Sequence, residues 1–184
     1  MLGLLGPGPV EPQVAHGHHL AAALGDFTGR FLDLGSGGGV PGLVLAVAWP
    51  RARGTLLDSR RKAWAALEAA VAVLDLAPRI EVVCARAEIL ARAPAYREQF
   101  DLVVARAFGS PAVTAESAVG FLAPAGRLVV TEPPTPQPGR WPEAQLAALG
   151  FGPAQPRPGY VEISRTGARV ESWPRSRPTK SPLW

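Results

Sequence analysis

The chain has 184 residues, 47% of them hydrophobic, and a formal net charge of +4. This length predicts one domain with a sizeable core. No apolar run of about 18 residues is free of charge and proline, and residues 1–9 lack a cationic start, so we expect a cytosolic protein with neither a membrane span nor a secretory signal.

Strand and helix patterns alternate along most of the chain. Residues 1–29 precede the first predicted strand and are expected to form a helical segment. Five short apolar runs follow, as expected for parallel strands buried on both faces. They are Arg30–Leu34, Gly54–Asp58, Arg79–Cys84, Phe100–Ala105 and Arg127–Thr131. The clearest helix is Arg60–Asp75, where Trp64, Leu67 and Val71 recur at helical spacing. The alternation predicts right-handed crossovers and an open doubly wound sheet.

The pattern changes after the fifth predicted strand. Pro142–Leu149 reads as a short helix with a proline near its start and Gly150 just past its end. Tyr160–Ser164 and Ala168–Trp173 flank a Thr166-Gly167 turn and predict an antiparallel hairpin. Five α/β units closed by a hairpin predict an α/β fold of the Rossmann-like class I methyltransferase type, with a seven-stranded, mostly parallel sheet.

The end of the chain differs from the rest in charge and composition. Residues 1–156 contain 13 basic and 13 acidic side chains, whereas residues 157–184 contain six basic and two acidic ones. This asymmetry suggests a polyanionic partner, although a solvated basic tail gives the same count. We therefore expect an N-terminal helical segment (1–29), a methyltransferase domain (30–173) and a basic, proline-rich tail (174–184). Residues 132–142 hold five prolines and predict an irregular loop.

The first predicted strand runs directly into a glycine-rich loop, FLDLGSGGGVPGL. Bare glycines before a helix leave amides open to an anionic or polar ligand. No Gly-Lys-Ser/Thr follows, which excludes the phosphate-binding loop of nucleoside triphosphatases. Asp33 at the strand end would face the phosphates of a dinucleotide but would suit the ammonium of S-adenosylmethionine. Asp58 ends the second strand, where an acid accepts hydrogen bonds from ribose hydroxyls of either ligand. Together these residues favour S-adenosylmethionine over NAD.

Glu88 follows the third predicted strand in the segment CARAE. An acid at this place would lie near the edge of an adenine ring. It would also be favoured by the dipole at the start of a helix, and the sequence leaves these two roles open.

Several of these segments occur together in one order: DLGSGGGVPG, the TLLDS strand followed by RRK, the RAE turn, DLVVARA and WPRSRPTKSPL. They resemble the bacterial glucose-inhibited division protein B (GidB) family, methyltransferases that modify a guanine N7 of small-subunit (16S) rRNA with S-adenosylmethionine. The resemblance covers Phe31–Leu183 and implies ribosomal RNA or the small ribosomal subunit as partner. It implies cofactor contacts from Asp33, Gly35, Ser36, Gly37, Gly39, Asp58, Ser59, Ala87, Glu88 and Arg106. It also implies a catalytic role for Arg106 and RNA contacts from Arg175, Arg177 and Lys180.

The chemistry of guanine N7 suits the residues near the fourth predicted strand. N7 attacks with a free lone pair, so catalysis can rest on alignment rather than on a base. The guanidinium of Arg106 matches the O6/N7 edge of guanine or a phosphate. A salt bridge from Arg106 to Asp101 or Glu116 is the alternative. Phe108 could stack on an unpaired base or belong to the core.

Other functions remain open in the sequence. Glu132 follows the fifth predicted strand, where the family tends to place a lysine, and this favours a methyltransferase of small molecules or proteins as the alternative. A non-catalytic cofactor-binding or RNA-binding relative is a further one. We expect no metal site, because His16, His18 and His19 have no acid or cysteine at ligand spacing and the single cysteine, Cys84, cannot hold a metal alone.

Overall fold

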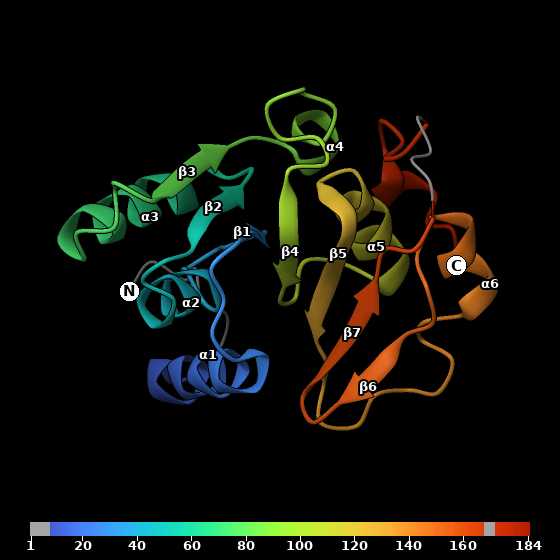
Figure 1. The fold of residues 1–184 in the computed structure, drawn as a ribbon, viewed down its shortest axis with the longest axis horizontal. Helices are drawn as coiled ribbons and strands as arrows, with labels where there is room; N and C mark the ends of the chain where they lie inside the picture. The colour runs from blue at the N-terminus through green and yellow to red at the C-terminus, as the bar shows by residue number, and fades with distance from the viewer. Residues whose placement is uncertain (1–7, 168–171) are drawn as a thin grey trace.

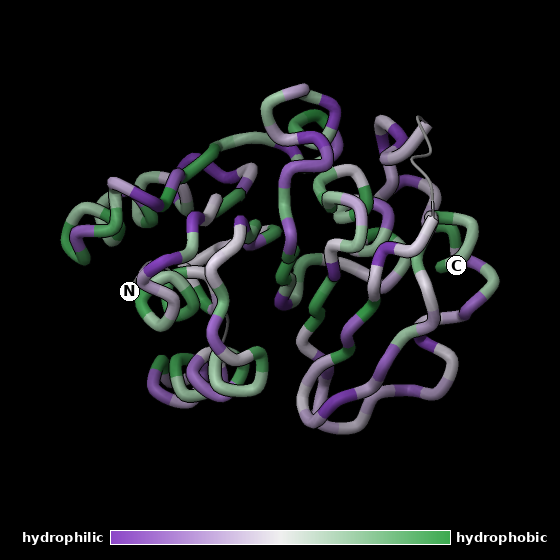
Figure 2. Tube along the Cα trace, viewed as in Figure 1, coloured by the Kyte–Doolittle hydropathy of each residue, from purple (hydrophilic) through white to green (hydrophobic). Residues whose placement is uncertain are grey.

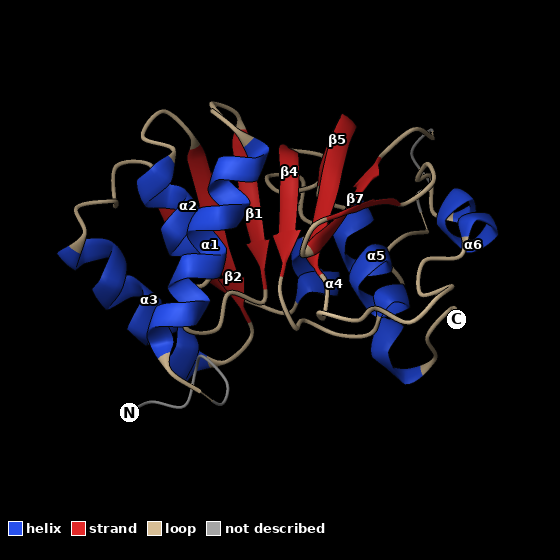
Figure 3. Ribbon diagram, turned by 90° about the horizontal axis from the view of Figure 1, so that it is seen from below, coloured by secondary structure: helices blue, strands red, loops and turns tan. Residues whose placement is uncertain are grey.

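The computed structural model describes residues 8–167 and 172–184 and shows a twisted sheet between two layers of helices (Figures 1 and 3). The sheet has seven strands in the order β3-β2-β1-β4-β5-β7-β6. The strands are β1 (Arg30–Leu34), β2 (Arg53–Asp58), β3 (Ile80–Cys84), β4 (Phe100–Ala105), β5 (Leu122–Thr131), β6 (Gln155–Arg157) and β7 (Tyr160–Ser164). The first five are parallel, and β7 is antiparallel to both β5 and β6. The predicted fold class is confirmed.

The helices lie on both faces of the sheet because neighbouring strand residues point to opposite sides. They are α1 (Val10–Leu24), α2 (Gly42–Ala48), α3 (Arg61–Val73), α4 (Ala87–Leu90), α5 (Pro111–Val119), α6 (Glu143–Ala148) and the 3₁₀ turn η1 (Pro178–Lys180). On β1, Phe31 packs with α1, α2 and α3, whereas Leu32 and Leu34 pack with α4, α5 and α6. Figure 2 shows hydrophobic colour along the central strands and paler, more polar colour at the far end of the β6–β7 hairpin.

The hairpin that closes the sheet is formed by β6 and β7, and the expected second arm, Ala168–Trp173, lies mostly outside the described residues. Both edges of β7 are already occupied, by β5 on one side and β6 on the other. Residues 168–171 lie outside the described part of the chain, and Ser172 and Trp173 are not in a strand. The strand β6 was not predicted from the sequence because Pro156 is its central residue. An edge strand tolerates proline, since one row of its backbone groups needs no partner strand.

The strand β5 begins at Leu122, five residues before its predicted start at Arg127. Its early part pairs with Phe100 of β4, and the register then shifts before Leu102. Ala125 has a φ of 62° at this irregularity. Pro124 and Gly126 made the segment look like a loop, whereas pairing with β4 extends the strand through it.

The N-terminal helix α1 packs against α2, so the described part of residues 1–29 joins the body of the fold. Leu20 and Ala21 of α1 are buried with Leu45 of α2. Gly17 lies so close to α2 that an added Cβ would stand 3.0 Å from Val44. Within the described residues, no helix combines the length and apolar character that a membrane crossing needs.

Candidate active site

A cavity of about 610 Å³ opens at the carboxyl ends of the parallel strands. Ligands of open α/β sheets bind at this edge, at the point where the strand order reverses, which is here between β1 and β4. Its wall is formed by the ends of the first four strands, by α5 and by the tail. These residues are Gly35, Leu57–Arg60, Ala85–Glu88, Ala107–Ser110, Val113, Ser117, Pro178, Thr179 and Pro182.

The glycine loop after β1 folds back on the end of β2. The amides of Gly35 and Ser36 donate to the Leu57 carbonyl, at 2.8 and 2.9 Å. Gly35, Gly37 and Gly39 all have positive φ values, of 77°, 55° and 93°. A Cβ on Gly35 would meet the Phe108 ring at 2.6 Å, so a side chain there would close the gap between β1 and the β4–α5 loop. Gly35 lines the cavity, whereas Ser36, Gly37 and Gly39 do not reach its wall.

Asp33 is buried beside this loop, on the face of β1 that packs against α2. Its Oδ2 accepts a hydrogen bond from the amide of Gly42 at 3.1 Å, and the Ser36 hydroxyl donates to its backbone carbonyl at 2.9 Å. Its Oδ1 is buried and has no hydrogen-bond partner among the described residues. Burial raises the pKa of Asp33 to about 7, although hydrogen bonds and the charge of Arg106 oppose this rise. The carboxyl group therefore keeps one oxygen with unused hydrogen-bonding capacity, and it does not itself line the cavity.

Asp58 lies at the end of β2 and lines the cavity, as expected. The carboxylate accepts a hydrogen bond from the amide of Gly37 at 2.9 Å and forms an ion pair with Arg60 at 3.0 Å. Burial acts to raise the pKa of Asp58, but the hydrogen bonds from Arg60 and Gly37 outweigh it and lower this pKa. The Arg60 side chain is 57% exposed, so it can leave the carboxylate when another donor binds. Arg60 was not predicted from the sequence.

The two carboxylates are brought together, because Asp33 and Asp58 flank the same glycine loop. The negative charge of Asp58 contributes to the raised pKa of Asp33. Asp58 is therefore the acid exposed on the cavity wall, and Asp33 is the buried acid behind the same loop, with a raised pKa.

The turn between β3 and α4 forms the next part of the wall. Ala87 and Glu88 line the cavity and are buried, and Ser59 lines it from the end of β2. The Glu88 carboxylate lies 2.9 Å from Nη2 of Arg86. Glu88 therefore stands both at the start of α4 and on the cavity wall, so that both roles considered from the sequence are compatible with its position.

Arg106 does not line the cavity but points toward α1. Its guanidinium donates to the side chain of Gln13. Neither expected ion pair forms, because Asp101 accepts from the amide of Arg30 and Glu116 pairs with Arg175. Gln13 had no distinguishing signal in the sequence, since it is one polar residue of a helix separated from Arg106 by 93 positions.

A second residue of α1 also belongs to this neighbourhood. Burial, followed by the charges of Arg106 and His19, lowers the pKa of His16. Its Nε2 is buried and has no hydrogen-bond partner among the described residues. In the described part of the chain, no group of three or more histidine, cysteine or acidic residues is placed to hold a metal ion.

Phe108 and the basic tail residues occupy different positions from one another. Phe108 lines the cavity and also packs against the core cluster, which combines the two roles considered for it. Arg177 and Lys180 are exposed, and the described residues give their side chains no partner. Arg175 points inward to Glu116, with 2.6 Å between Nη2 and Oε2. The structure thus separates Arg175 from the other two predicted RNA contacts.

Comparison with known proteins gives the family of the chain. A family model described as rRNA small subunit methyltransferase G (GidB) matches residues 18–135, which is more than half of the sequence. The chain belongs to this family. The predicted family is thereby confirmed, and the matched residues include the glycine loop but not the tail motif.

Relatives of the GidB family match over part of their length. A ribosomal RNA small subunit methyltransferase G of Prochlorococcus marinus (strain MIT 9313) is 48% identical over 101 residues, which are 55% of this chain and 41% of the relative. Another, from strain NATL1A, is 39% identical over 74% of this chain and 52% of the relative. This GidB chain therefore spans about half the length of the curated relatives it matches.

Solved structures support the fold of this GidB chain. A SAM-dependent O-methyltransferase from Thermotoga maritima superposes with a TM-score of 0.60 and 15% identity, covering 85% of this chain and 67% of that one. At this identity the likeness shows the fold alone.

Proposed function

We propose that this chain is an S-adenosylmethionine-dependent methyltransferase that modifies guanine N7 in small-subunit rRNA. The observation that carries the proposal is the cavity at the carboxyl edge of the sheet, with Asp58 on its wall and a buried, unpartnered Asp33 oxygen beside its glycine loop. Membership of the rRNA small subunit methyltransferase G family supports the substrate class.

The residues present fit the ribose and the amino-acid end of the cofactor. Asp58 would accept hydrogen bonds from the ribose hydroxyls in place of Arg60, and Asp33 would take the ammonium group through its free Oδ1. Ala87 and Glu88 would border the base. When bound, S-adenosylmethionine supplies an electrophilic methyl group on a sulfonium.

The state of the acids on the cavity wall supports an acceptor that needs no base. Asp58 and Glu88 are the acidic residues among the lining side chains, and each is paired with an arginine. Neither is therefore placed to remove a proton. Guanine N7 carries a lone pair and loses no proton on methylation, so positioning of the acceptor is sufficient.

We assign positioning of the acceptor to Arg106 and contacts with the RNA backbone to Arg177 and Lys180. Arg106 would exchange the Gln13 amide for the O6/N7 edge of guanine or for a phosphate. Arg177 and Lys180 are exposed and close to the cavity through their neighbours Pro178 and Thr179. Free cations at the rim suit a phosphate backbone.

The position of Glu132 in the structure weakens the case for a small-molecule acceptor. Glu132 is paired with Arg140 at 3.0 Å and accepts a hydrogen bond from Trp141 at 3.1 Å, so its charge is balanced within the chain. A further cavity of about 570 Å³, between the 132–142 loop and the β6–β7 hairpin, has Arg140 and Arg157 on its wall. A pocket for a small apolar acceptor would be expected to lack such a basic wall.

Transfer of a labelled methyl group tests the proposal. The full chain is incubated with tritiated S-adenosylmethionine and small ribosomal subunits from a strain that lacks the gene. We expect label in the small-subunit rRNA and, after reduction and aniline treatment, strand cleavage at the modified guanine. The Asp58→Asn variant is the matched loss-of-binding control. Absence of label from every RNA would refute methyl transfer to RNA, and label without cleavage would refute the N7 position.

A further inference from the structure

The C-terminal tail forms one wall of the cavity. Pro178 is buried, and together with Thr179 and Pro182 it lines the space that Gly35 and Asp58 border on the side of the sheet. The turn η1 contacts α5, and Figure 1 shows the red C-terminal segment beside this helix. We call residues 177–182 the strap.

The strap is held by an ion pair that reaches into the protein. Glu116 of α5 is 0% exposed, and its two oxygens accept from Nε and Nη2 of Arg175, at 2.8 and 2.6 Å. The backbone amide of Arg175 also donates to Glu116, at 2.9 Å. Nη2 of Arg175 further donates to the carbonyl of Ser181 at 2.7 Å. One guanidinium thus connects the interior of α5 to the far end of the strap.

Contacts on both sides fix the segments next to the strap. Arg92 donates to the carbonyl of Pro174 at 2.6 Å, and Arg97 donates to that of Trp173 at 3.1 Å. After the strap, the indole of Trp184 donates to the carbonyl of Arg140 at 3.0 Å. Between these points Arg175 is the side chain that joins the strap, at the carbonyl of Ser181, to the buried carboxylate of Glu116.

The position of these contacts indicates which part of a ligand the strap would cover. Pro174 lies near the end of α4, since Arg92, two residues after this helix, donates to its carbonyl, and a Cβ on Gly120 would stand 2.8 Å from Pro174 and 2.9 Å from Ala91. The first residues of α4, Ala87 and Glu88, line the cavity in the turn after β3, which is where an acid would lie near the edge of an adenine ring. The strap therefore closes the end of the cavity where a nucleoside base would lie.

We propose that Arg175 is a positioning residue for the cofactor: by pairing with Glu116 it holds the strap against the base of a bound adenine nucleoside. This rests on the proposed function, because it takes S-adenosylmethionine as the ligand of the cavity. It assigns Arg175 to cofactor binding and not to RNA contact.

Calorimetric binding of S-adenosylhomocysteine to the full chain tests this role. Glu116→Leu combined with Arg175→Leu removes both charges and leaves no unpaired buried ion. We expect this double variant to bind about tenfold more weakly than the unchanged chain. Arg175→Lys keeps the charge but cannot bond both carboxylate oxygens and Ser181, so we expect a smaller loss. Arg51→Ala, which replaces an exposed arginine outside both the strap and the cavity wall, is the matched control and should bind as the unchanged chain does.

Tryptic cleavage after Lys180 separates this role from a purely structural one. Release of Ser181–Trp184, followed by mass spectrometry, reports how often the strap opens. We expect S-adenosylhomocysteine to slow this release several-fold in the unchanged chain and to have little effect in the double variant. A purely structural ion pair would change the release rate equally with and without ligand.

The outcomes distinguish the two proposals. If the unchanged chain does not bind S-adenosylhomocysteine, the proposed function fails. If it binds, and the double variant and Arg175→Lys bind equally well, the role of the strap is refuted while the proposed function stands. Ligand binding without protection of the Lys180 bond would also refute it.

Discussion

The buried carboxyl of Asp33 should make the free energy of unfolding fall as the pH rises, and Asp33→Asn should remove this dependence. The ordinary pKa of 3.8 is raised to about 7 by burial. Between these values the unfolded chain is ionised at Asp33 while the folded chain keeps its proton, so the unfolded state binds fewer protons. The contribution of Asp33 to stability is therefore full below the unfolded pKa and is lost as the pH rises through the folded pKa.

The size of the effect follows from the linkage relation. In the window between the two pKa values the free energy of unfolding falls by about 1.4 kcal/mol for each pH unit, and it levels off above the folded pKa. From about pH 5 to about pH 8 the loss is roughly 2–3 kcal/mol. Asparagine keeps the shape and can still accept the bond from the Gly42 amide, but it does not titrate. The variant should gain this amount relative to the unchanged chain over that range.

Urea unfolding of the two chains at a series of pH values measures the difference directly. Asp26→Asn, which replaces an exposed acid, controls for the general effect of an amide substitution. Saturating S-adenosylhomocysteine should reduce the advantage of Asp33→Asn at the upper end of the range, because an ammonium beside Oδ1 favours the ionised carboxylate. Parallel stability curves for the unchanged chain and Asp33→Asn would show that burial of this carboxyl is not what we infer.

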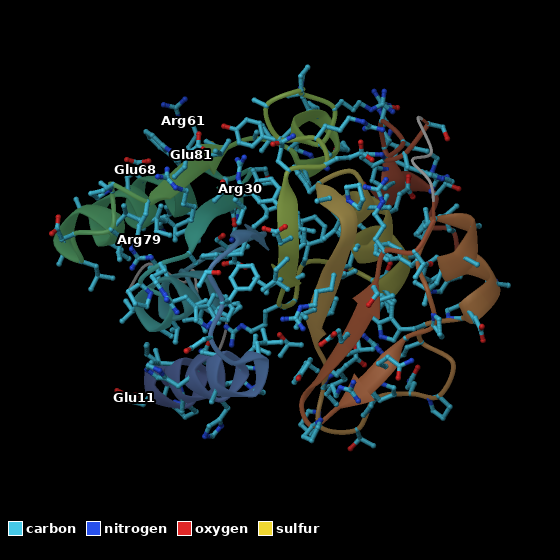
Figure 4. The ribbon with its side chains drawn as sticks, viewed as in Figure 1. Glu11, Arg30, Arg61, Glu68, Arg79 and Glu81 are labelled. Carbon is cyan, nitrogen blue, oxygen red and sulfur yellow. The ribbon has the colours of Figure 1, made fainter. Side chains whose placement is uncertain are left out.

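Three further variants test other parts of the site. Arg60→Ala should bind S-adenosylhomocysteine up to about fivefold more tightly, since the ion pair of the half-exposed Arg60 with Asp58 no longer competes with the ribose. The control is Arg61→Ala, because the Arg61 side chain points outward from α3 (Figure 4). Weaker binding by Arg60→Ala would contradict the competition. Gly35→Ala should abolish cofactor binding and should lower the free energy of unfolding in urea more than Gly139→Ala does. Both glycines have positive φ, where a side chain costs about 1–2 kcal/mol, but only a side chain at position 35 would also clash with Phe108. Equal losses of unfolding free energy in the two variants would show that the clash is absent. Replacing Arg177 and Lys180 together by alanine should reduce the salt dependence of RNA binding by roughly two counterions in a filter-binding assay, with cofactor affinity unchanged; an unaltered slope would exclude both from the RNA contact.

Local sequence patterns were sufficient for the first four parallel strands. β1 and β4 occupy the predicted residues, and β2 and β3 differ from their predicted starts by one residue. Strands buried on both faces are short, continuous apolar runs, so consecutive residues alone are enough to locate them. The same holds for the glycine loop and for Asp58, because both follow a strand end directly.

Patterns failed where a partner distant in the chain decides the structure. Pro156 does not look like a strand residue, yet β6 forms because β7 offers an edge to it. The polar partner of Arg106 is Gln13 of α1, and the acid that holds Arg175 is Glu116 of α5. None of these pairs has a fixed spacing, so the sequence could not connect them.

The sequence by itself determined the class of fold, the family motifs and the carboxyl edge where a nucleoside ligand would bind, because each follows from the period of apolar residues and from loops that need glycine. Only the tertiary structure decided that Asp33 is buried behind the loop, that Arg60 pairs with Asp58 and that Arg175 turns inward to Glu116. The physical reason is that burial and ion pairing depend on which segments meet in space, and a charged residue next to water and one that reaches a buried acid have the same local sequence signal.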